Sequence, residues 1–65
     1  MPETNLKRLR QAAGLTQKEL AEKSGVNLRT IQNYEQGFKD INGAHVITAL
    51  AIADALKTDI RNILE

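Results

Sequence analysis

Three polar side chains in the middle of the chain have the types and spacing to bind a ligand together. Arg29, Gln32 and Asn33 follow one another at i, i+3 and i+4, so on a helix they share one stripe. Arg can grip guanine, and Gln or Asn can read adenine, when such a stripe lies in the major groove of DNA. On any other surface helix the same stripe is an ordinary solvated face, so its meaning depends on the elements that position it.

Most other chemistry is excluded by residue types that the chain lacks. With no cysteine and a single histidine, His45, it offers no disulfide framework, zinc finger, cysteine nucleophile or histidine-rich metal site. Tyr34 and Phe38 are the only aromatic residues, too few for a platform on which bases stack. No phosphate loop, paired-carboxylate site or nucleophile triad is present. We therefore expect no catalytic residues, no cofactor and no metal, and we expect His45 to be a capping or surface residue.

Length and composition indicate one small domain. The 65 residues are 42% hydrophobic and 26% charged, which predicts a single domain over residues 1–65. The longest apolar stretch, around residues 46–55, is too short to cross about 30 Å of hydrocarbon. Residues 1–5 have neither a basic region nor an apolar region of the kind that directs export. We expect a cytoplasmic protein without membrane contact.

Charge is divided unevenly along the chain, although the net charge is only +1. Residues 1–39 carry seven basic and four acidic side chains, a net +3, whereas residues 40–65 carry two basic and four acidic ones, a net −2. The first three-fifths of the chain is therefore the part suited to an anionic partner.

Glycines and capping residues mark three short helices in residues 1–37. Gly14, Gly25 and Gly37 each follow a segment with apolar residues at helical spacing, and each suits the left-handed position that ends a helix. Thr16-Gln17-Lys18-Glu19 forms a capping box that predicts a helix from Gln17. Asn27 is a good N-cap for a helix over Leu28–Gln36, with Ile31 and Tyr34 on its inner face.

The rest of the chain predicts two more helices. Residues 38–43 indicate a loop, in which Asp40 or Asn42 caps the next helix. Ten of the thirteen residues from Ala44 to Leu56 are apolar, so we expect a helix buried nearly all round, either at the centre of the fold or against a second copy of the chain. Thr58 is expected to cap a last short helix. No strand pattern appears, and the predicted fold is all-α with five helices.

The second and third helices satisfy the requirements of a helix-turn-helix. A steep crossing after a short turn needs a small residue at the contact, a residue that accepts positive φ, and apolar residues that clamp the pair. Ala21 and Gly25 meet the first two requirements. The clamping set is Leu20, Val26, Ile31 and Tyr34.

Several stretches of the sequence resemble the Cro/C1-type helix-turn-helix family, the lambda-repressor-like DNA-binding domains of bacteria and phage. The likeness extends over nearly the whole chain, and the stretches that carry it are residues 6–10, 14–21, 25–26, 30–31, 34–37 and 53–56. Two features depart from the family pattern. Ser24 stands where an aliphatic residue is usual, which we expect to loosen the clamp. The loop after Gly37 is a few residues longer than is usual and lacks the frequent proline.

The resemblance implies a role for each candidate residue. The helix Leu28–Gln36 would enter the major groove, with four base-reading residues: Leu28, Arg29, Gln32 and Asn33. Leu28 would meet a thymine methyl. The residues that contact or position phosphates would be Thr16, Gln17, Lys18, Asn27, Lys7, Arg8 and Lys39. Arg10 and Glu35 would form an ion pair between the first and third helices. The residues expected in the core alone are Leu6, Leu9, Leu20, Ala21, Val26, Ile31, Leu50, Ala53, Leu56 and Ile60.

The predicted function is sequence-specific binding of double-stranded DNA by a transcriptional regulator, most simply a repressor. One helix reads only a few base pairs, so we expect a homodimer on a palindromic operator, with half-sites about 34 Å apart. The alternative is a helix-turn-helix module that binds another protein, as in antitoxins or bridging factors. An apolar outer face on the third helix would favour that alternative.

Overall fold

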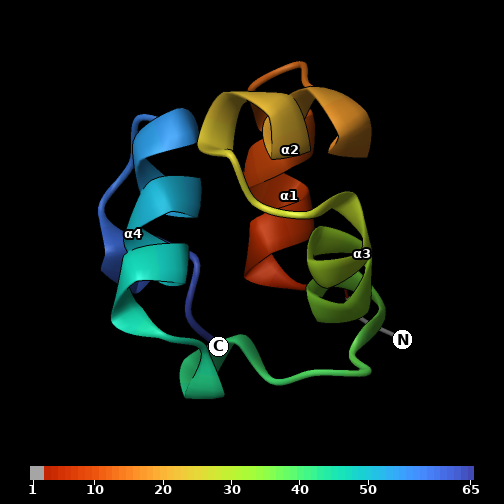
Figure 1. Ribbon diagram of the computed structural model, residues 1–65. Coiled ribbons are helices and arrows are strands. Elements are labelled where there is room, and N and C mark those ends of the chain that lie inside the picture. The colour runs from red at the N-terminus through yellow and green to blue at the C-terminus, as the bar shows by residue number, and fades with distance from the viewer. Residues whose placement is uncertain (1–2) are drawn as a thin grey trace.

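The computed structural model describes residues 3–65, and within this range it contains four α-helices, two 3-10 turns and no strand (Figure 1). The helices are α1 (Asn5–Ala12), α2 (Gln17–Ser24), α3 (Leu28–Gln36) and α4 (Val46–Ala55), and the turns are η1 (Ile41–Gly43) and η2 (Ile60–Asn62). In Figure 1, α2 lies across the top, α3 and α4 lie on opposite sides, and α1 runs behind them.

The first three helices begin and end where capping chemistry places their ends. Thr4, Thr16 and Asn27 each accept a hydrogen bond from the backbone of the next helix. Gly25 and Gly37, with φ of +72° and +81°, end α2 and α3 in the left-handed conformation. The predicted bounds of α2 and α3 are therefore close to those in the structure.

A single core lies between the four helices. Its side chains come from all four helices, from η1 and from the C-terminal residues: Leu6, Leu20, Ile31, Tyr34, Ile41, Ala49, Ile52, Ala53 and Ile63. Ile41 belongs to η1, inside the segment that the sequence indicates as a plain loop. Burying an apolar side chain there fixes the connection between α3 and α4, although this connection contains no proline.

Within a single chain α4 is not buried nearly all round, so the expectation of a central helix is wrong, and its burial against a second copy stays a prediction. Ala49, Ile52 and Ala53 face the core, but Val46, Ile47 and Leu50 are 67%, 83% and 42% exposed. Leu50 is therefore not one of the core residues. Within residues 3–65, α2 and η2 pack against the inner side of α4.

The expected fifth helix is only the 3-10 turn η2. The residue before this segment's predicted cap, Lys57, has a φ of +54°, which interrupts the helical backbone. Asp59, rather than Thr58, caps the turn by accepting from the Arg61 amide. So short a segment gains too few hydrogen bonds to offset the cost of starting an α-helix.

The side chains of two asparagines, Asn5 and Asn42, hold the C-terminal residues in place of a fifth helix. The Asn42 side chain exchanges hydrogen bonds with the Glu65 backbone, at 3.0 and 2.9 Å. The Asn5 side-chain amide donates to the Leu64 carbonyl at 2.7 Å. The backbone N–H of Asn5 donates to the Glu65 carboxylate. These bonds join the start of α1 and the α3–α4 connection to the C-terminal residues, and no sequence pattern indicates them.

Candidate nucleic-acid interface

The two sides of α3 differ in what they contact. Ile31 is fully buried and Tyr34 is 9% exposed on the inner side. On the outer side Leu28 and Arg29 are exposed, and Gln32 and Asn33 are half-buried. Within residues 3–65 no hydrogen bond occupies the side-chain polar groups of Arg29, Gln32 or Asn33. This leaves the whole outer stripe free to bind a ligand.

Arg10 and Glu35 form a buried ion pair between α1 and α3. The Arg10 Nε donates to Glu35 Oε2 at 2.7 Å, and its Nη2 donates to Oε1 at 3.0 Å. The two side chains are 11% and 2% exposed. The remaining Nη1 donates to the Leu15 carbonyl in the turn before α2, at 2.7 Å. A bidentate pair with this additional bond fixes the orientation of α3 against α1.

Gln17 also joins this network, a contact that no sequence pattern indicates. Its Nε2 donates to Glu35 Oε1 at 3.1 Å, so the Glu35 carboxylate receives three hydrogen bonds. Gln17 and Glu35 are eighteen residues apart, and no helical spacing relates them. Only the packing of α2 against α3 brings the two side chains together.

The start of α2 is held by a complete capping box. Thr16 Oγ1 accepts from the Glu19 amide at 3.1 Å, and the Glu19 carboxylate accepts from the Thr16 amide at 2.9 Å. These bonds lower the pKa of Glu19 from its ordinary value. Gln17 is the first residue of the helix, and Lys18 is exposed beside it. The positive end of the α2 dipole is therefore open at these residues.

Ser24 takes part in the turn between α2 and α3 rather than in the core. Its hydroxyl accepts from the Val26 amide at 3.2 Å and donates to the Ala21 carbonyl at 3.4 Å. The Asn27 carboxamide oxygen then accepts from the Arg29 amide at 2.8 Å. The hydrophobic contact expected of an aliphatic residue at position 24 is thus replaced by hydrogen bonds to the turn.

The predicted phosphate-contacting cations do not all lie together. Lys39 is exposed just after the end of α3. Lys7 lies on α1, with its Nζ 3.9 Å from Glu3 Oε1, and borders a hollow whose other side is the end of α3 and Phe38. Both lysines therefore flank α3.

Arg8 lies beside the C-terminal turn instead. Its guanidinium donates to the Asn5 side chain, and with Asn62 it borders a separate hollow. The structure does not bring Arg8 to α3, because one helical step around α1 separates its direction from that of Lys7. Its predicted phosphate contact stays a prediction without support from this placement.

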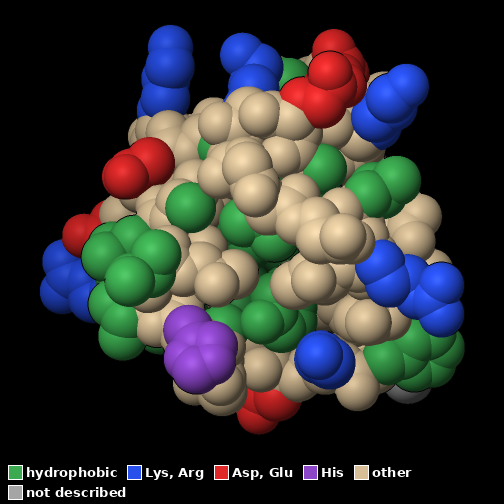
Figure 2. Space-filling model, in the orientation of Figure 1, with side chains coloured by type: hydrophobic (Ala, Val, Ile, Leu, Met, Phe, Trp, Pro, Cys, Tyr) green, Lys and Arg blue, Asp and Glu red, His purple; other side chains and the backbone are tan. Residues whose placement is uncertain are grey.

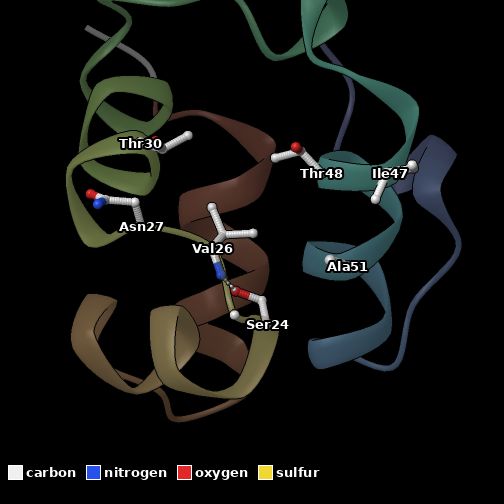
Figure 3. A pocket seen from close by; sticks show the side chains of 8 residues that line it. Ser24, Val26, Asn27, Thr30, Ile47, Thr48 and Ala51 are labelled. Carbon is white, nitrogen blue, oxygen red and sulfur yellow. Dashed lines mark hydrogen bonds between the residues drawn. The ribbon is translucent and has the colours of Figure 1, made fainter.

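A groove of about 370 Å³ separates the α2–α3 turn from α4. Figure 3 shows Ser24, Val26, Asn27 and Thr30 on one side, and Ile47, Thr48 and Ala51 of α4 on the other. Figure 2 shows Lys and Arg side chains over α2 at the top and toward α3 at the right, while hydrophobic side chains gather over α4 at the left. A cluster of hydrophobic side chains thus lies on the α4 side of the groove, with acidic and basic side chains at its left edge (Figure 2).

His45 is the N-cap residue of α4, but its side chain makes no capping hydrogen bond. In residues 3–65 no three side chains of the kinds that bind metals come together. In the same part of the chain no helix is both long enough and apolar enough to cross a membrane.

The comparison with protein families agrees with the geometry. A family model described as a helix-turn-helix matches residues 6–63, so the chain belongs to the Cro/C1-type helix-turn-helix family, a class of DNA-binding domains. Neither a curated protein nor a solved structure matches the chain significantly.

Proposed function

We propose that the chain is the sequence-specific DNA-binding domain of a cytoplasmic transcriptional repressor of a bacterium or phage. In this proposal α2 and α3 are the helix-turn-helix, and α3 lies in the major groove. The observation that carries it is the contrast across α3. Its inner side is fixed by Ile31, Tyr34 and the Arg10–Glu35 pair. Its outer side presents groups that can hydrogen-bond base edges and that form no other side-chain bond in the part of the chain that the structure describes.

Each candidate residue has a role in this proposal. Arg29, Gln32 and Asn33 read base edges, and Leu28, which is 36% exposed, contacts a thymine methyl. The phosphates are held at the start of α2 by Thr16, Gln17 and Lys18. Beside the end of α3 they are held by Lys39 and by Lys7 of α1. Asn27 caps and positions α3. Two copies bind a palindromic operator, because one α3 reads only a few base pairs.

Selection of bound sites from random duplex DNA tests this function. We expect a palindromic consensus, and affinity that falls with salt at a log–log slope of about −0.9 for each phosphate neutralised. Lys18→Ala should weaken binding to the selected and the random duplex alike, with Lys57→Ala as the control in the acidic part of the chain. Affinity that stays constant from low to high salt would refute DNA binding.

One observation favours a second candidate function, a module that binds another protein. Val46, Ile47 and Leu50 form an exposed apolar side of α4. Apolar residues grouped in this way are typical of protein contacts. If selection yields no preferred duplex, and Ile47→Lys abolishes capture of a cellular protein that Arg29→Ala leaves intact, this second function replaces the first.

A further inference from the structure

The Glu35 carboxylate has more bonding partners than an ion pair with Arg10 requires. Arg10 alone neutralises its charge through two hydrogen bonds, yet Oε1 also accepts from Gln17. Glu35 is 8% exposed as a whole residue, and no buried side-chain nitrogen or oxygen in residues 3–65 lacks a partner. The third bond is therefore part of a fully satisfied network, in which the position of the Gln17 side chain is defined.

The Gln17 amide keeps one donor after this bond. A carboxamide nitrogen has two N–H groups, and only one of them points to Glu35. Within residues 3–65 the backbone N–H of Gln17 is also unpaired, because it precedes the first bonded amide of α2. Both free donors belong to one half-buried residue at the positive end of the α2 dipole.

We propose that Glu35 is a positioning residue for phosphate binding: it fixes the Gln17 amide so that the second N–H donates, with the backbone N–H, to one DNA phosphate. This inference rests on the proposed function and adds a residue to it. Glu35 belongs to α3, so the phosphate contact at α2 and the reading face of α3 become one rigid unit. The contact that sets the register of the domain on the duplex is thereby joined directly to the helix that reads the bases.

The first test needs no variant. In the free protein, NMR relaxation of the side-chain amide of Gln17 should give an order parameter near that of rigid backbone, about 0.85. Gln11 lies exposed on α1 and makes no side-chain hydrogen bond within residues 3–65, so its amide should fall below about 0.6. A Gln17 amide as mobile as that of Gln11 would overturn the proposal.

The second test is a double-mutant cycle on DNA binding. Gln17→Ala should weaken binding of the selected and the random duplex about tenfold in the wild-type background, the value of one hydrogen bond to a charged group. In the Arg10→Met/Glu35→Leu background, in which α3 keeps an apolar contact with α1, the same change should cost about twofold or less. Gln11→Ala is the matched control and should change neither value.

The outcomes separate this inference from the proposed function. Equal losses for Gln17→Ala in the two backgrounds refute the positioning role and leave DNA binding intact. If the wild-type protein binds no duplex, the proposed function fails, and the phosphate contact fails with it. If the double replacement does not fold, the order parameter of Gln17 in the wild-type protein decides the question alone.

Discussion

α3 and α4 have nearly equal lengths, nine and ten residues. The two sides of α3 differ in polarity, whereas the two sides of α4 differ in burial. On α3 the inner side is apolar apart from Glu35, and the outer side is polar apart from Leu28. On α4 both sides are apolar, and only the inner one, with Ala49, Ile52 and Ala53, is buried. α3 therefore specifies its own orientation, whereas α4 is oriented by the elements packed against it.

The two helices also begin differently. The N-cap of α3, Asn27, bonds the first turn through its side chain, and the N-cap of α4, His45, does not. The ion pair and the Gln17 bond add two specific contacts to α3, whereas the inner side of α4 is apolar. Four predictions test this contrast between specific polar contacts and general apolar packing.

The largest effect is expected from breaking the ion pair that orients α3. Glu35→Leu alone leaves the buried Arg10 charge unpaired and should lower the free energy of unfolding by about 3–5 kcal/mol. Arg10→Met/Glu35→Leu should cost far less, because no charge then stays buried without a partner. A double-mutant cycle in urea measures the coupling. Coupling near zero would show that the pair does not orient α3.

A second prediction distinguishes the two sides of α4. Ile52→Ala should lower the free energy of unfolding by about 2–5 kcal/mol, because the side chain is fully buried and its loss leaves a cavity. Ile47→Ala should change it by less than about 0.5 kcal/mol, since that side chain is 83% exposed. Urea denaturation compares them directly. Equal losses would mean that another copy of the chain covers the outer side of α4 in solution.

The third prediction concerns the outer side of α3. Arg29→Ala should lower affinity for the selected operator by roughly 1–3 kcal/mol and relax the base preference at one symmetric pair of positions. Its circular dichroism should not change, because Arg29 is exposed. Binding to the selected and a random duplex is measured at one salt concentration. An unchanged ratio for Arg29→Ala, Gln32→Ala and Asn33→Ala would remove α3 as the reading helix.

The smallest effects are expected at the helix starts. Thr16→Ala should lower the free energy of unfolding by about 0.5–2 kcal/mol, because the Glu19 amide loses its bond to the Thr16 hydroxyl, one half of the α2 capping box. His45→Ser should raise it by up to about 1 kcal/mol, because α4 has no side-chain cap to lose. Thermal unfolding of both variants provides the measurement. A loss of stability in His45→Ser would show that the imidazole makes a contact of its own.

The Glu19 carboxylate gives the Thr16 prediction a pH dependence. Its pKa is lower in the folded protein than in the unfolded chain, so its contribution is complete above the unfolded pKa and disappears as pH falls through the folded pKa. Thr16→Ala and the wild-type protein should therefore become more alike in stability below the folded pKa. In the Glu19→Gln background, the difference in stability that Thr16→Ala causes should not change over the same pH range.

The sequence by itself determined much of α2 and α3. Thr16, Glu19 and Asn27 act on backbone groups within a few residues, and Gly25 ends α2 through its own φ, so local chemistry fixes these helix ends. The alternation of Ile31 and Tyr34 with Arg29, Gln32 and Asn33 likewise predicts which side of α3 is outside. The Arg10–Glu35 pair is predicted only by the family resemblance, because no local spacing joins residues on two different helices.

Tertiary structure alone decided the rest, because the remaining features depend on contacts between segments distant in sequence. An apolar helix carries no signal for which of its sides is covered, so the exposure of Ile47 and Leu50 results from where α2 and η2 pack. The end of the chain turns to Asn5 and Asn42 rather than continuing as a helix. The bond between Gln17 and Glu35 forms only where α2 meets α3. The two residues are eighteen positions apart, so no local sequence pattern relates them.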